Sequence, residues 1–185
     1  MRRYPLSARE EILRHYASWT ALSALRSEAP IKSKKDIYPL LREIRFAQVF
    51  DRSKGLVECE EFEAWHKESL ETVIKEHPKL ANQYGWAAKL VNVYLKTYAY
   101  VGDGGRDGLR DCLHPPIDAS LWRGVKRKFT GRNDILNKSH AITRIASITS
   151  HDKYLVLIDG LREASHQLNC SLIEIEQLWE VAEDA

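Results

Sequence analysis

Cysteines and clustered histidines are scarce in this sequence. The three cysteines, Cys59, Cys112 and Cys170, lie far apart, and no two of them form a CxxC pair. This spacing argues against a disulfide framework, a zinc knuckle or a four-cysteine iron–sulfur cluster. The seven histidines never occur at the HxxxH or HExxH spacing of a metal site. We therefore expect reduced cysteines, no metal and no cofactor.

Long apolar runs and a strong net charge are also absent. No stretch reaches the length that spans a membrane, and the first residues lack the apolar core of a signal peptide. The formal net charge is only +2, so any basic binding face must come from segregation of the charges. The 44% hydrophobic content is enough for an ordinary core. These features predict a soluble, cytoplasmic protein without a membrane partner, and they leave its oligomeric state open.

Alternating strand patterns and internal repeats are missing, whereas helical signals run through the chain. Ser7 and Glu10 form a capping box. The helix that it opens has a predicted inward face of Ile12, Tyr16, Trp19 and Ala24. A second capping box at Ser171 and Glu174 opens a predicted final helix.

Apolar spacing between these two boxes predicts the remaining helices. The runs cover residues 37–46, 60–76, 86–101, 119–129 and 153–168, and the polar residues 130–140 predict a loop. We therefore predict an all-α fold of about seven or eight helices. Length favours one domain over residues 1–185, with residues 1–55 as a candidate N-terminal helical lobe.

The run over residues 86–101 is apolar almost all round, which is typical of a buried central helix. Its few polar residues include Lys89, Asn92 and Lys96, at spacings that share one helix face. Such a stripe lines either a functional site or solvent, where the lysine stems lie along the surface and the charges reach water.

A second unusual segment is His114-Pro115-Pro116-Ile117-Asp118. The two prolines fix the path of the chain into a helix, and Asp118 stands where a helix N-cap is expected. A capped carboxylate is held rigid and ionised, so it can also stabilise a developing cation or orient an amine. The cap and the functional interpretation are compatible.

The helix predicted after Asp118 has a basic face opposite its apolar one. The basic residues there are Arg123, Lys126, Arg127 and Lys128, with Arg132 in the segment that follows. A stripe of this kind either contacts phosphates or is simply solvated.

The two central segments together resemble the helix-hairpin-helix DNA glycosylase superfamily, in particular its bifunctional 8-oxoguanine branch. The segment Gly85-Trp86-Ala87-Ala88-Lys89 resembles the hairpin that ends in a catalytic lysine, and Pro116-Ile117-Asp118 resembles the aspartate motif that opens a later helix. The resemblance covers about residues 80–129. It departs from the family pattern at Ala87, where the second hairpin glycine is missing, and the Gly-rich residues 102–108 account for a longer interval between the two motifs.

The resemblance implies a DNA-binding base-excision protein, a DNA glycosylase and AP lyase. Lys89 would attack the sugar C1′ of a flipped, damaged nucleotide and form a Schiff base, with Asp118 stabilising the developing charge. The expected nucleic-acid contacts are Gly85, Lys96, Arg123, Lys126 and Arg127. Two alternatives stay open: a non-catalytic helical protein that binds nucleic acid or regulates on the same scaffold, and a helical protein-interaction module.

Overall fold

The computed structural model describes residues 7–25 and 28–180, and this part of the chain is all-α, without a strand. Nine α-helices lie in it, seven of them longer than four residues, in agreement with the predicted fold class. Their bounds are α1 (Ala8–Ala24), α2 (Lys34–Glu43), α3 (Ala47–Phe50), α4 (Cys59–Glu76), α5 (Tyr84–Leu95), α6 (Leu109–Cys112), α7 (Ala119–Lys128), α8 (Asn133–Ser139) and α9 (His151–Leu168). Short 3-10 turns form η1 (Arg52–Lys54), η2 (Pro78–Leu80), η4 (Ile145–Ser147) and η5 (Ile173–Leu178), and η3 (Lys96–Val101) is a π-helical turn.

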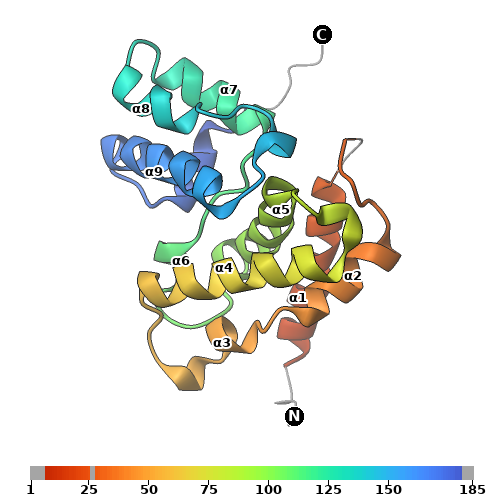
Figure 1. Ribbon diagram of the computed structural model, residues 1–185. Coiled ribbons are helices and arrows are strands. Elements are labelled where there is room, and N and C mark those ends of the chain that lie inside the picture. The colour runs from red at the N-terminus through yellow and green to blue at the C-terminus, as the bar shows by residue number, and fades with distance from the viewer. Residues whose placement is uncertain (1–6, 26–27, 181–185) are drawn as a thin grey trace.

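Helix α5 lies at the centre of the fold, between α1–α4 on one side and α7–α9 on the other (Figure 1). Every residue of α5 except Lys89 is buried, as the apolar run predicted. The helix continues directly into the π-helical turn η3. A helix that is buried on all sides packs against different neighbours on its different faces. Lys89 and Asn92 on α5 therefore contact different parts of the fold.

Helix α1 starts at the predicted capping box but packs through a different face from the one expected. Ile12, Tyr16 and Trp19 are 68%, 51% and 55% exposed, so the prediction that they point inward is wrong. The buried residues of α1 are instead Ala17 and Ala21. Their small side chains let α1 approach α5 closely, which a count of large apolar residues does not reveal.

Residues 130–140, predicted as a loop, contain helix α8. This helix is mostly polar, but Ile135 and Ser139 are buried where it packs on α9. A Cβ on Gly160 of α9 would lie only 2.2 Å from the Ser139 amide nitrogen, so glycine is required for the close approach of the two helices. Ile135 is the single buried apolar side chain of α8, and one such residue does not give a helical period in the sequence.

The predicted final helix is the shorter 3-10 segment η5. Its capping box is half formed: the Ser171 amide donates to Glu174 Oε2 at 2.9 Å, but the cap position itself falls on Leu172. The segment ends at Leu178, and Trp179 is its C-cap residue. The first box is complete, with Ser7 and Glu10 each accepting a hydrogen bond from the backbone of the other.

Two of the three cysteines form a disulfide, which corrects the expectation of reduced thiols. Cys59 begins α4 and Cys112 ends α6, and their Cα atoms are 5.0 Å apart. A sequence separation of 53 residues gave no hint of this proximity. Cys170 is free. No helix of the described residues is long and apolar enough to cross a membrane.

Candidate active site

Lys89 and Asp118 meet in the folded chain. Nζ of Lys89 lies 3.2 Å from Oδ2 of Asp118. Lys89 projects from the middle of α5, and Asp118 is the N-cap residue of α7. Their side chains are 13% and 22% exposed, so the pair is shielded from bulk water yet reachable. The structure thus joins the two residues of the hypothetical site, and their catalytic role stays a prediction.

The pair opens into a cavity of about 500 Å³. This is the size of an ordinary small-molecule site. The residues that give it its chemical character are three indoles, three cations and three carboxylates: Trp86, Trp122, Trp179, Lys89, Lys96, Arg144, Glu28, Asp118 and Glu176. The cavity therefore offers flat apolar surface together with charges of both signs.

Asp118 is held as a carboxylate by several donors. Its Oδ1 accepts the backbone N–H groups of Ser120 at 3.0 Å and Leu121 at 3.1 Å, which is the predicted N-cap. Burial would raise the pKa of Asp118, but the Lys89 charge, the Leu121 amide and the Trp179 indole together lower it below its usual value. The cap and the lysine contact therefore coexist on one side chain.

Trp179 reaches the site from the far end of the sequence. Its indole Nε1 donates to both carboxylate oxygens of Asp118, at 3.1 and 3.3 Å. Gly124 makes this approach possible, because a Cβ there would lie 1.7 Å from the Leu178 carbonyl oxygen. Nothing in the local sequence indicates a contact between Trp179 and Asp118, which are 61 residues apart.

Lys96 forms a second ion pair in the same cavity. Its Nζ lies 2.7 Å from Glu176 Oε2. Burial raises the pKa of Glu176, although Lys96 partly opposes the shift. Asn92, which shares the predicted polar stripe with the two lysines, is instead fully buried and does not line the cavity. Asn92 follows Lys89 by three residues, so the two side chains are about 60° apart around the helix axis. This angle is enough for Asn92 to face a different neighbour.

Gly85, one of the predicted nucleic-acid contacts, packs inside the protein. Its amide donates to the Ile148 carbonyl at 2.9 Å, and a Cβ would lie 2.4 Å from the Ile145 carbonyl oxygen. The glycine therefore lets η4 approach the start of α5. Its N–H group is already paired, so it is not free for a ligand.

The predicted basic face of α7 is exposed. Arg123, Lys126 and Arg127 lie opposite the buried Leu121 and Val125. Arg123 donates to Ser120 Oγ at 2.9 Å, and Arg127 lies 2.8 Å from the Glu180 carboxylate with its side chain 79% exposed. The face is thus accessible on the same helix that carries Asp118, and its contact with nucleic acid stays a prediction.

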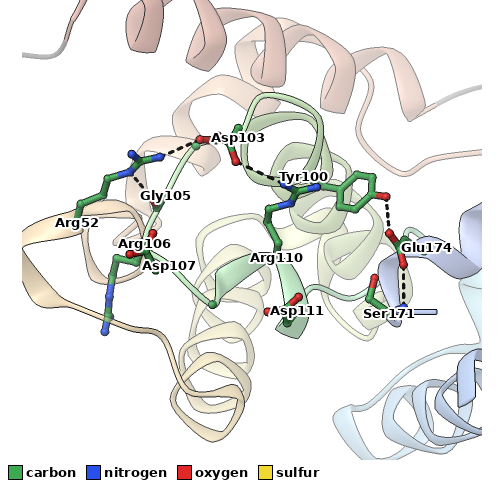
Figure 2. Close-up of a pocket in the computed structure, with 12 residues that line it drawn as sticks. Arg52, Tyr100, Asp103, Gly105, Arg106, Asp107, Arg110, Asp111, Ser171 and Glu174 are labelled. Atoms are coloured by element: carbon green, nitrogen blue, oxygen red, sulfur yellow. Dashed lines mark hydrogen bonds and ion pairs between the residues drawn. The ribbon is translucent and has the colours of Figure 1, made fainter. Parts of the chain in front are cut away.

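A second hollow, of about 400 Å³, lies along the Gly-rich segment at residues 102–108. Its arginines bond to the protein itself (Figure 2). Arg52 donates to the backbone carbonyls of Gly105 and Asp103, and Arg110 pairs with the Asp103 carboxylate at 3.5 Å. Arg106 is buried among backbone carbonyls and Glu61. These contacts order the segment rather than present cations to a ligand.

No protein-family model matches this sequence, and neither a curated protein nor a solved structure matches it. Among the described residues, no group of three or more histidine, cysteine, aspartate or glutamate side chains could hold a metal ion.

Proposed function

We propose that this protein is a DNA glycosylase with AP lyase activity that acts through a Schiff base on Lys89. The observation that carries the proposal is the 3.2 Å contact between Lys89 Nζ and Asp118 Oδ2 inside a cavity with three indoles. The pair matches the lysine and aspartate motifs that resemble the helix-hairpin-helix glycosylases. A cavity of about 500 Å³ accommodates a single flipped base.

The chemistry begins with an ion pair, and an ammonium group is no nucleophile. Lys89 first loses one proton to solvent, and the resulting amine attacks C1′ of the flipped nucleotide while the Asp118 carboxylate stabilises the positive charge that develops. The C1′–base bond breaks, and its electron pair leaves with the base, which takes a proton from water. Opening of the sugar ring then transfers a second proton from Nζ to O4′ and leaves the protonated imine. The Asp118 carboxylate then takes a proton from C2′ of this imine, and the C3′–O bond breaks to release the 3′ phosphate, which gives the lyase product.

The exposed basic residues of α7 give the proposed DNA surface. Arg123, Lys126 and Arg127 stand on the helix whose first turn holds Asp118, so a backbone bound along α7 would pass the cavity. Lys96 is paired with Glu176, so we assign it to the cavity rather than to the backbone contact. Phosphate contacts of this kind are independent of sequence and weaken with salt.

Borohydride trapping tests the proposal directly. The protein is incubated with duplex DNA that holds 8-oxoguanine or an abasic site, and reduction of the imine leaves a covalent adduct visible on a denaturing gel. Lys89→Gln should abolish the adduct and leave DNA binding intact. Lys96→Gln is the matched control, because it removes a second ion-paired lysine from the same cavity and should still form the adduct. Equal trapping by Lys89→Gln and the parent would rule the proposal out.

A non-catalytic DNA-binding protein is the second candidate. Two observations favour it. The Lys89 ammonium is already paired with Asp118, and the Gly85 amide is already bonded to the Ile148 carbonyl, so the segment that resembles the hairpin serves packing. That protein would bind duplex DNA with a steep salt dependence but would form no adduct on either substrate. Absence of both adduct and DNA binding would leave the helical interaction module.

A further inference from the structure

A chain of buried polar side chains lies beside α5, outside the lining of the cavity. His66, Asn92, His114 and Tyr154 are each at most 1% exposed, and they bond to one another. Buried polar groups are tolerated when they are hydrogen-bonded, and a satisfied network rigidifies its surroundings.

The direction of each bond follows from one fixed donor. Nδ2 of Asn92 lies 3.1 Å from the Pro115 carbonyl, which can only accept, so the orientation of the amide is fixed. Its second hydrogen points to the Tyr154 hydroxyl at 2.9 Å, and its Oδ1 accepts from His66 Nε2 at 2.7 Å. Burial and the neighbouring His114 lower the pKa of His66 to about 3, so this ring is neutral.

The chain continues from Tyr154 to a carboxylate. Because the Tyr154 hydroxyl accepts from Asn92, its own hydrogen goes to His114 Nδ1 at 2.9 Å. His114 Nε2 then donates to Glu63 Oε1 at 2.8 Å, and Arg162 pairs with the same carboxylate oxygen. The donors run in one direction from His66 through Asn92, Tyr154 and His114 to Glu63, and a branch from Asn92 ends on the Pro115 carbonyl. Only Nδ1 of His66 in this network has no hydrogen-bond partner.

The two ends of this chain attach to the two halves of the candidate site. Asn92 stands one turn after Lys89 on α5. His114 and Pro115 lead directly into the residues that end at Asp118. Bonds from Asn92 to the Pro115 carbonyl and from His114 to Glu63 therefore fix the path of this segment against α5 and α4. The Cys59–Cys112 bond ties the same segment to α4 two residues earlier.

We propose that Asn92, His114, Tyr154 and Glu63 are positioning residues that set the contact between Lys89 and Asp118. None of the four touches the cavity, so they act through the backbone of the 114–118 segment and through α5. The catalytic part of this inference rests on the proposed glycosylase function, whereas the geometric part does not.

Tyr154→Phe is the sharpest variant, because it deletes one hydroxyl and almost no volume. The lysines are dimethylated with ¹³C-formaldehyde, and the Lys89 methyl signal is assigned by its loss in Lys89→Gln. Asp118→Asn supplies the position of that signal without the carboxylate. In Tyr154→Phe the Lys89 signal should move toward the Asp118→Asn position, while the signal of Lys96, paired with Glu176, stays unchanged. On abasic DNA the trapping rate should fall about tenfold, with DNA affinity unchanged.

Two variants of Glu63 give the rescue test. Glu63→Leu removes the acceptor of the His114 hydrogen bond and should move the Lys89 signal, whereas Glu63→Gln keeps an acceptor oxygen and should restore it. If the Lys89 signal stays in place in both Tyr154→Phe and Glu63→Leu, the network is structural and the inference fails, even when stability drops. If the signal moves but the parent protein traps no DNA, the positioning role stands and the glycosylase proposal fails.

Discussion

Two lysine–carboxylate pairs share one cavity, yet their carboxylates are held differently. Asp118 accepts two backbone N–H groups at the start of α7 and an indole N–H, and its pKa is lowered. Glu176 lies in a 3-10 segment and contacts Lys96, and its pKa is raised by burial. Proximity to a lysine is therefore not enough to lower the pKa of a buried carboxylate. Asp118 also accepts the N–H groups of a helix start and of Trp179, whereas the charge of Asp118 itself raises the pKa of Glu176.

Loss of the Cys59–Cys112 disulfide should give the largest change in stability. It should affect the Lys89–Asp118 pair more than the Lys96–Glu176 pair. A bond that closes a loop of 53 residues stabilises by about 4 kcal/mol in the chain-entropy account. Cys59→Ser should lower the free energy of unfolding by that amount, measured by urea denaturation. Cys170→Ser is the control and should change it little, because Cys170 is free. The Lys89–Asp118 contact should loosen, since Cys112 is near Asp118 in the chain, and an unchanged Lys89 methyl signal would contradict this.

Removal of each carboxylate should sharpen the comparison at a smaller scale. Asp118→Ala loses a helix cap and leaves Lys89 without its partner, so we expect a loss of about 2 kcal/mol. Asp118→Asn keeps the cap and should lose less. Glu176→Gln should change stability by under about 0.5 kcal/mol, since the cost of burying that charge offsets its attraction to Lys96. Equal losses for Asp118→Ala and Glu176→Gln would contradict the assigned difference.

The two pairs should also respond oppositely to pH. The pKa of Asp118 is lowered on folding, so its stabilisation is complete above the unfolded value of about 4 and is lost as the pH falls through the folded value. The pKa of Glu176 is raised, so its contribution is favourable at acid pH and is lost as the pH rises through the folded value. Between pH 3 and 7, the free energy of unfolding should therefore depend less on pH at the acid end in Asp118→Asn than in the parent protein. In Glu176→Gln it should be higher than in the parent at the neutral end.

The smallest effect on stability is expected on the exposed face of α7. Arg123→Ala, Lys126→Ala and Arg127→Ala should each change the free energy of unfolding by under about 0.5 kcal/mol. Each should lower the slope of log affinity against log salt for duplex DNA by about one. Lys153→Ala, an exposed cation at the start of α9, is the control and should leave the slope unchanged. Unchanged slopes for all three α7 variants would mean that this face is only solvated.

Sequence reasoning worked best where a residue acts through its neighbours in the chain. The Ser7 capping box, the buried run at 86–101 and the Asp118 cap all depend on contacts within a few residues. It failed for the face of α1, where Ala17 and Ala21 pack inward and Trp19 is exposed. There the identity of the neighbouring helix decided the outcome, and periodicity alone does not contain that identity.

The sequence by itself determined the all-α class, the central helix and the places of Lys89 and Asp118 on two separate helices, because helix propensity, apolar period and capping are local properties. Only the tertiary structure decided that Lys89 reaches Asp118, that Trp179 joins them and that Cys59 bonds to Cys112. These contacts join residues from distant parts of the chain. They depend on how closely helices pack, which glycines such as Gly124 and Gly160 permit at particular points.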